Sequence, residues 1–287
     1  MKRIVSGLLI PIASMIFITC PGDAEEQPST NGDAPEQPSV NDVAVCLQGK
    51  PFIADGAFSL AAEGPGDAHE VSELHWVAHE GCERFVIDFA AEDDTPAASV
   101  GEVRAEVLRD LGVVRVTLRQ VEWVDQEATD AMFDGELARA AYSVWSDEGR
   151  WVYVDLHLAE EAEAHVAVLE EPGRVLVDLR LGGGPIPPSA VSDKRVVVLE
   201  PRPGEQTYPL AVTGYARTFE ANVVARIERR GEEVFETFTT ATAWADAWGH
   251  YSLSIEEGPS GPTELHVGEY SARDGTWEGV VVELEMQ

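Results

Sequence analysis

Two histidines and a cysteine lie close together in the first half of the chain, and these residue types can bind Zn²⁺ or form a thiol–histidine pair. The apolar and polar residues around His75, His79 and Cys82 alternate, which indicates a strand. On a strand the side chains of His75 and His79 would lie about 13 Å apart, too far to bind one zinc ion. We therefore expect no metal at these residues, no catalytic thiol, and no cofactor.

Other catalytic patterns are also missing from the sequence. Serine hydrolases carry their nucleophile in a G-x-S-x-G turn, which does not occur in the chain. The glycines at 182–184 are followed by prolines rather than by the Lys and Ser or Thr of a phosphate-binding loop. Two neighbouring carboxylates could serve a glycosidase, but 52 acidic residues make such a pair uninformative. We expect a non-catalytic protein; the alternative is a cell-wall hydrolase with its site in the N-terminal domain.

The first twenty residues have the composition of an export signal. Lys2 and Arg3 precede an apolar run of 16 residues, from Ile4 to Thr19, and Cys20 ends it. A membrane-spanning helix needs about 20 apolar residues, so a permanent span is the weaker interpretation. The arrangement resembles the lipobox of bacterial lipoproteins, in which the terminal cysteine is lipidated. The resemblance implies that Cys20 anchors the protein to the outer face of the cytoplasmic membrane; without lipid the protein would be secreted.

Lipidation of Cys20 would leave Cys46 and Cys82 as the two remaining cysteines. Exported proteins fold in an oxidising compartment, where such a pair is expected to form a disulfide bond. Closing a loop of this length would stabilise the fold by roughly 3 to 4 kcal/mol if the effect comes from restricting the unfolded chain.

The chain is strongly acidic, with 52 Asp and Glu residues against 20 Lys and Arg and a formal net charge of -32. This charge repels nucleic acid, so we expect no nucleic-acid partner. Only Lys2, Lys50 and Lys194 are lysines. We interpret the acidic, lysine-poor surface as that of a halophilic protein, because salt screens its self-repulsion. No segment has the regularly spaced carboxylates and the glycine turn of a calcium loop.

Composition divides the rest of the chain into four segments. Residues 21–45 have no basic side chain and repeat the sequence Glu-Gln-Pro-Ser, which indicates a disordered acidic tether. Residues 46–181 alternate apolar and polar side chains over short runs, and only 126–141 fits a short helix or an elaborated loop. Residues 182–193 are rich in glycine and proline and form a linker. From 194 to 287 the strand pattern resumes.

The strands expected from this alternation are short and closely spaced. In the N-terminal domain they fall at 85–89, 114–118, 152–158 and 175–181. In the C-terminal domain they fall at 196–199, 210–216, 222–228, 234–241, 251–255, 265–271 and 280–285, with turns at Arg230-Gly231 and Asp274-Gly275. Seven short strands in this length are typical of an immunoglobulin-like sandwich. We expect an all-β protein with two small β-sandwich domains.

Several motifs of the C-terminal domain resemble the Gmad2 immunoglobulin-like domain, which is associated with bacterial sporulation and germination proteins. In chain order they are Pro201–Gly204, Pro209–Ala216, Phe219–Val223, Gly249–Tyr251 and Tyr270–Gly275. The resemblance brings no catalytic residues and implies, as an alternative function, a sporulation or germination factor of the envelope.

The same motifs lead us to expect structural roles for four residues. They are Phe219 in the core, Gly214 and Gly275 at positions of special backbone geometry, and Glu220 as an acceptor of turn hydrogen bonds.

The N-terminal domain resembles AMIN-like domains, which are compact β-structures of exported envelope proteins. The resemblance lies in His79–Phe89 and in Arg174–Leu179. AMIN relatives are linked to localisation at the cell wall, so the resemblance implies a wall-binding role for this domain.

Exposed aromatic side chains are what a sugar- or peptide-binding face would use. Trp244 and Trp248 flank a short segment expected to be a loop, and Trp277 follows the Asp274-Gly275 turn. For Trp244 and Trp248 we expect packing beneath a loop, and the alternative is a ligand platform that would also include Trp277. The tryptophans in or beside strands are expected in the core: Trp123, Trp145 and Trp151.

Together these features predict a lipid-anchored envelope protein whose two β-domains bind cell-wall polymer or another envelope protein. A binding module predicts a shallow aromatic or edge-strand surface, whereas a hydrolase predicts a polar cleft with a perturbed carboxylate or histidine. The sequence indicates no oligomeric state and does not identify the ligand.

Overall fold

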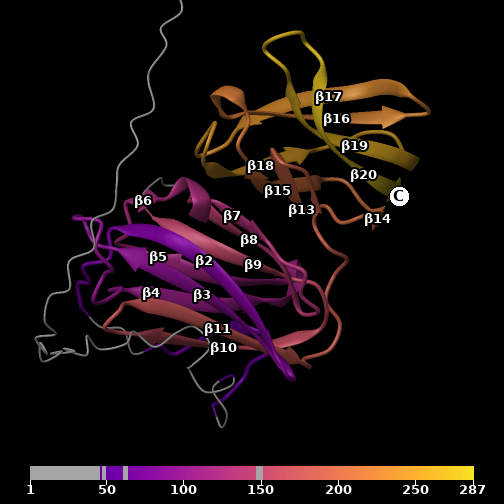
Figure 1. Ribbon diagram of the computed structural model, residues 1–287. Helices are drawn as coiled ribbons and strands as arrows, with labels where there is room; N and C mark the ends of the chain where they lie inside the picture. The colour runs from indigo at the N-terminus through magenta and orange to yellow at the C-terminus, as the bar shows by residue number, and fades with distance from the viewer. Residues whose placement is uncertain (1–45, 47–49, 61–63, 147–150) are drawn as a thin grey trace, which may run out of the picture. The chain divides into compact units, whose positions relative to one another are not determined.

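The computed structural model describes residue 46 and residues 50–60, 64–146 and 151–287. The signal peptide expected at 1–20 with Cys20, and the tether expected at 21–45, lie outside these residues. Within them the chain forms 20 β-strands, three 3₁₀ turns and no α-helix (Figure 1). The same residues contain no helix of the length and apolarity that crossing a bilayer requires. The described part of the chain is therefore all-β, as the alternation predicts.

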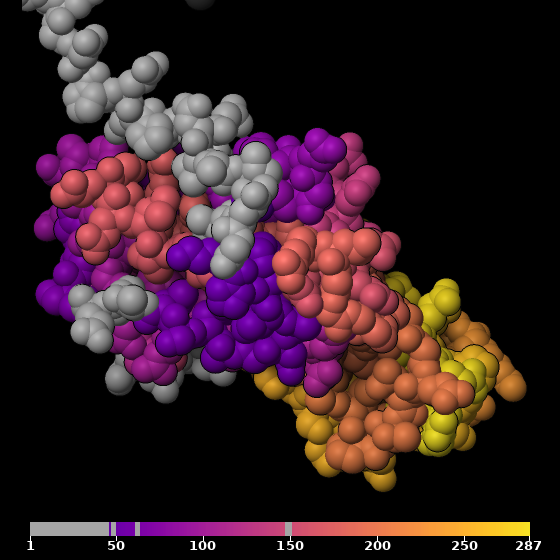
Figure 2. Space-filling view, turned by 90° about the horizontal axis from the view of Figure 1, so that it is seen from below, coloured from indigo at the N-terminus to yellow at the C-terminus, as the bar shows by residue number. Residues whose placement is uncertain are grey.

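The first sandwich has two sheets. In the first sheet the strand order is β10 (Ala162–Leu169), β11 (Arg174–Leu181), β3 (Cys82–Ala90), β2 (Glu70–His79) and β6 (Trp123–Val124). In the second the order is β1 (Gly56–Ala57), β4 (Val103–Leu108), β5 (Val113–Leu118), β9 (Val152–Leu158) and β8 (Ala138–Trp145), with β7 (Asp130–Met132) paired to β8. Distant parts of the sequence thus become neighbours, and Figure 2 shows the indigo segment after residue 50 against the salmon end of the domain.

The core of the first sandwich lies between these two sheets. Alternate residues of β3, such as Phe85 and Ile87, pack there with Val175 and Val177 of β11. Val154 of β9 enters the same core from the opposite sheet. The period of two that predicted these strands is therefore the pattern of inward-facing side chains.

The disulfide bond expected between Cys46 and Cys82 is present, with 6.4 Å between the two Cα atoms. Cys82 is the first residue of β3 and lies opposite His79 in the β2–β3 hairpin. The bond therefore ties the start of the first domain to a central strand of its sheet.

The second sandwich is immunoglobulin-like and also has two layers. One layer continues the large sheet through β18 (Trp248–Ile255), β15 (Leu210–Ala216), β13 (Val196–Glu200) and β12 (Val191–Ser192). The other has the order β14 (Gly204–Gln206), β20 (Trp277–Met286), β19 (Gly261–Tyr270), β16 (Asn222–Arg229) and β17 (Glu232–Thr240). The seven strands expected from the sequence are all present, and β14 and β12 are additional.

Glycines allow the tight geometry of this sandwich at two of the expected positions. A β-carbon on Gly214 of β15 would collide with the carbonyl oxygen of Val197 on the neighbouring strand. Gly275 has a φ of 73°, a left-handed conformation that suits glycine, in the turn between β19 and β20. Both expected structural roles are confirmed.

The expectation of a short helix or an elaborated loop at 126–141 was wrong for the residues that form strands, at 130–132 and 138–141. Residues 126–128 form a 3₁₀ turn, after which the chain enters β7 and then β8. The apolar residues of this segment have a helix-like spacing because β7 and β8 follow each other closely in the sequence. In the structure β7 pairs with β8, and β8 pairs with β9, so the segment forms strands. The segment expected to be a linker, 182–193, contains the two-residue strand β12 near its end, and it belongs to the same compact unit as both sandwiches.

A third hydrophobic cluster joins the two sandwiches. Val144 of β8 and Trp248 of β18 are Cα partners in a short parallel pairing between the domains. Around it, Tyr142 of the first sandwich contacts the rings of Tyr215 and Trp248 of the second. Because these aromatic side chains are buried, the junction is packed like a core.

Asp155 places a buried carboxylate in this junction. Its two oxygens each accept a hydrogen bond of 2.7 Å from the Arg115 guanidinium, and the Tyr215 hydroxyl donates to the same carboxylate. Burial, together with the charge on Asp155, raises the pKa of Tyr215 well above its usual value, so the phenol keeps its proton and donates. A residue of β9 thus binds both β5 of its own domain and β15 of the other.

We expect D155N to destabilise the protein by roughly 3 kcal/mol, because Arg115 would keep a largely buried charge without its partner. Denaturant unfolding followed by tryptophan fluorescence measures this change. D246N, which alters an exposed carboxylate of the second domain, is the matched control and should change the free energy of unfolding by less than about 0.5 kcal/mol. Equal effects of the two variants would contradict the role given to Asp155.

His157 makes the stability of the junction depend on pH. Burial lowers its pKa to about 4, with Arg202 and Arg115 acting in the same direction and Asp155 opposing them. Between pH 6.5 and about 4 the unfolded chain binds a proton at this residue and the folded chain does not. The free energy of unfolding therefore decreases by roughly 3 kcal/mol as the pH falls from 6.5 through this window.

H157F should remove this dependence, because phenylalanine keeps a ring against Tyr142 and Tyr215 without a titrating nitrogen. The measurement is the free energy of unfolding at pH 7.5 and 4.5 for both proteins. We expect the loss of stability on acidification to be smaller in the variant than in the wild type. The same loss in wild type and H157F would refute the assignment.

Candidate binding face

The outer face of the sheet β14-β20-β19-β16-β17 is built by simple alternation. In β16, Val223, Ala225 and Ile227 point into the core, so Arg226 and Glu228 lie on the opposite face. On the neighbouring strand β19, the register places His266 beside Arg226 and Glu264 beside Glu228. We call this surface the outer face of the second sandwich.

Aromatic rings and one guanidinium cover the middle of the outer face. Trp277 lies edge-on to Tyr270, with 5.1 Å between ring centroids, and also contacts His266 at 6.3 Å. The Arg226 guanidinium lies 4.3 Å above the Trp277 ring. This stacking holds the tryptophan and the arginine in fixed positions on the sheet.

Two glycines let the neighbouring strands approach beneath these rings. Gly268 of β19 and Gly279 of β20 are direct Cα partners. A β-carbon on either residue would collide with backbone atoms of the other strand. The pair therefore leaves a flat surface without side chains, on which the Trp277 ring can lie between Tyr270 and His266.

Strand β17 forms one edge of the sheet and is the most exposed long strand of this domain. Among the described residues, β16 is the only strand paired with it. Its C-terminal end touches β18, where the Thr239 hydroxyl donates to the Ser252 carbonyl, while Val234 and Phe238 are exposed, Phe238 by 71%. An edge strand with exposed apolar side chains offers unpaired backbone groups to another chain.

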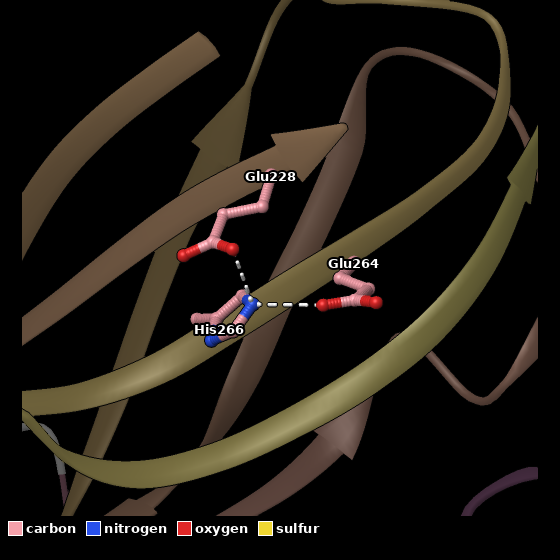
Figure 3. Close-up of side chains that lie close together, drawn as sticks. All are labelled: Glu228, Glu264 and His266. Atoms are coloured by element: carbon pink, nitrogen blue, oxygen red, sulfur yellow. Dashed lines mark hydrogen bonds and ion pairs between the residues drawn. The ribbon is translucent and has the colours of Figure 1, made fainter. Parts of the chain in front are cut away.

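Three side chains that could bind a metal ion converge on the same face (Figure 3). The Nε2 atom of His266 lies 3.5 Å from a carboxylate oxygen of Glu228 and 3.3 Å from one of Glu264. The other oxygen of Glu228 accepts from Arg226 at 3.0 Å. Glu228 and Glu264 come from adjacent strands, and the backbone register brings them together.

The possible tryptophan platform is only partly consistent with the structure. Trp248 is 1% exposed and belongs to the domain junction, so it cannot contact a ligand there. Trp244 is 57% exposed but lies outside this sheet, in the segment before β18. Only Trp277 lies on the outer face. Trp248 is packed, as expected, but it is the first residue of β18 rather than part of a loop.

Two expectations about core aromatics were also wrong. Phe219, expected in the core, is exposed because it starts a 3₁₀ turn at Phe219–Ala221. Trp123 is exposed as well, because β6 is a two-residue strand at the edge of its sheet. Trp145 and Trp151 are half-buried, and Trp145 packs against the first core.

His75 and His79 of the first sandwich do not come together, as strand geometry predicts. The Nε2 atom of His75 lies 3.1 Å from carboxylate oxygens of both Glu73 and Asp88. His79 instead lines a groove of about 790 Å³ beside the disulfide, together with Trp76 and Leu181.

The groove contains one buried carboxylate, Glu83. It accepts hydrogen bonds from the Trp76 indole at 3.0 Å and from the backbone N–H groups of Glu136, Leu137 and Ala138 at 2.6 to 2.9 Å. Four donors occupy both oxygens, so Glu83 anchors the segment before β8. The histidine with a lowered pKa, His157, lies in the domain junction and not in this groove.

Comparison with known families now places the outer face in a recognised domain. Residues 195–276 match Gmad2, an immunoglobulin-like domain of bacterial spore germination. The match covers β13 through β19, and thus most of the strands that form the face. No curated protein matches the chain. An envelope or germination-associated role is what the Gmad2 domain indicates.

The sequence could have revealed the charged residues of the outer face of the second sandwich, although no single motif marks them. Glu228, Glu264 and His266 are far apart in the chain, and 52 acidic residues hide the two glutamates. The usable signal was their spacing, because residues two apart on a strand point to the same face of the sheet. Arg226 and Glu228 have this spacing on one strand, and Glu264 and His266 have it on another. Strand order, which decides that β16 and β19 are neighbours, was missing.

Proposed function

We propose that the protein is a non-catalytic, lipid-anchored component of the cell envelope whose Gmad2 domain binds another envelope protein. The observation that carries the proposal is the free edge of β17, with Phe238 and Val234 exposed beside the aromatic outer face. An extended segment of a partner can add to such an edge through backbone hydrogen bonds, while side-chain contacts supply specificity. Anchoring through Cys20 would hold the domain outside the cytoplasmic membrane.

The composition of β17 narrows the chemistry of the partner. Glu232, Glu233 and Glu236 make the edge acidic, and Phe238 adds a large apolar surface. The segment that fits is extended, carries basic residues, and has at least one apolar side chain near Phe238. Cell-wall polymer is the alternative ligand, and the resemblance of the first sandwich to AMIN-like domains would imply that this sandwich binds it.

A role in sporulation or germination is a second proposal that the Gmad2 match favours. It specifies when the protein acts and is compatible with the same binding face. A wall hydrolase is less well supported, because Glu83 in the groove of the first domain is fully engaged in hydrogen bonds.

F238S should weaken binding by about tenfold or more, because an exposed aromatic residue at the centre of an interface contributes a large share of its energy. The measurement is retention of envelope-extract proteins on the immobilised full-length protein in high salt. W244S is the matched control, since Trp244 is another exposed aromatic residue of the same domain and lies outside the sheet.

Retention that survives F238S, or that W244S reduces equally, would contradict the proposed face. A parallel column of purified peptidoglycan separates the two ligand classes. Binding to peptidoglycan that resists protease treatment of the ligand, with no retention of extract proteins, would replace the protein partner with wall polymer.

A further inference from the structure

We propose that Glu228, Glu264 and His266 form a binding site for Zn²⁺ on the outer face of the Gmad2 domain. The site goes beyond the proposed function, because it requires no partner and no catalytic activity. It combines one imidazole nitrogen with two carboxylate oxygens, a set of ligands that zinc accepts.

The separations between ligand atoms fit a single small ion. Zinc lies about 2.0 to 2.2 Å from nitrogen and oxygen ligands, so tetrahedral geometry places neighbouring ligand atoms about 3.3 to 3.6 Å apart. The two distances from the Nε2 atom of His266 are 3.3 and 3.5 Å. One oxygen of Glu228 and one of Glu264 lie within 4.8 Å of each other, and rotation of the exposed Glu264 side chain can shorten this distance.

The surrounding charges give an independent reason for a cation at this position. Four glutamates form one row across four strands: Glu233, Glu228, Glu264 and Glu283 are successive Cα partners. Like charges directly opposite each other on a sheet destabilise it. Arg226 neutralises part of this negative charge, because its guanidinium lies 3.0 Å from a carboxylate oxygen of Glu228 and 4.0 Å from one of Glu233. A divalent ion between Glu228 and Glu264 would neutralise the centre of the row.

His266 is well positioned as the central ligand. Its residue is 9% exposed, and the Trp277 ring packs against the imidazole. Arg226 holds one oxygen of Glu228, which leaves the oxygen nearest His266 for the ion. The Glu264 side chain is 56% exposed, so the fourth position of the metal faces solvent. The site would therefore bind zinc with three protein ligands and one water.

The choice of zinc over calcium or magnesium follows from the donor atoms. Calcium takes six to eight oxygen ligands and magnesium keeps most of its water, whereas imidazole suits zinc and related transition metals. His75 provides a useful contrast, because it also lies near two carboxylates, those of Glu73 and Asp88. Within the described part of the chain, however, three ligand atoms converge to within 4.8 Å only at Glu228, Glu264 and His266.

Calorimetric titration of the full-length protein with ZnCl₂, in high salt with excess Mg²⁺, tests the site. We expect about one zinc ion per chain, with the affinity reduced about tenfold or more in H266Q and in E264Q. H75Q is the matched control and should bind zinc like the wild type. E264Q changes an exposed side chain and keeps the test valid if H266Q does not fold, which circular dichroism would reveal.

No zinc binding by the wild type, or equal binding by wild type, H266Q and E264Q, would overturn the proposal. A reduction in H75Q as large as in H266Q would show general binding to the acidic surface and would also overturn it. Retention of envelope proteins is measured separately without metal, so the outcome for zinc and the outcome for the binding face can be distinguished.

Discussion

The arrangement of the two sandwiches depends on the hydrogen bonds that Arg115 and Tyr215 donate to the buried carboxylate of Asp155. A charge inside a protein is costly unless it is paired and hydrogen-bonded, and here Arg115 and Tyr215 meet that requirement from two domains. The Asp155 side chain is fully buried, and Tyr142, Tyr153 and Trp248 belong to the hydrophobic cluster of the same junction. Asp155 has Arg115 as a partner within its own sandwich, but it contacts Tyr215 only when both sandwiches are folded and packed together. The junction is therefore specific as well as hydrophobic.

This junction determines which surfaces can meet a partner. The β18-β15-β13 layer is used for packing on the first sandwich, through Trp248, Tyr215 and Val197. The opposite layer keeps its outer face, and β17 keeps a free edge. The layer that the junction leaves open therefore carries the aromatic rings, the charged cluster around His266 and the exposed Phe238. Packing at one side of the domain and binding at the other follow from the same strand order.

Sequence reasoning succeeded where one strand was enough and failed where strand neighbours mattered. Alternation predicted β15 at 210–216 without error, and it predicted the turns at Arg230-Gly231 and Asp274-Gly275, because these features are local. It could not place Trp248 in a junction between domains, since that burial depends on β8, about a hundred residues earlier. The cluster of Glu228, Glu264 and His266 needed the register between β16 and β19, which composition does not contain.

Hydrogen exchange of the full-length protein, with and without its captured envelope partner, tests the central claim most directly. A partner strand added to the free edge of β17 would give its outward-facing amides new hydrogen bonds, so we predict slower exchange in residues 232–238. The groove around Glu83 in the first sandwich should exchange at an unchanged rate. Protection of that groove, with β17 unaffected, would contradict the claim that the Gmad2 domain carries the binding face.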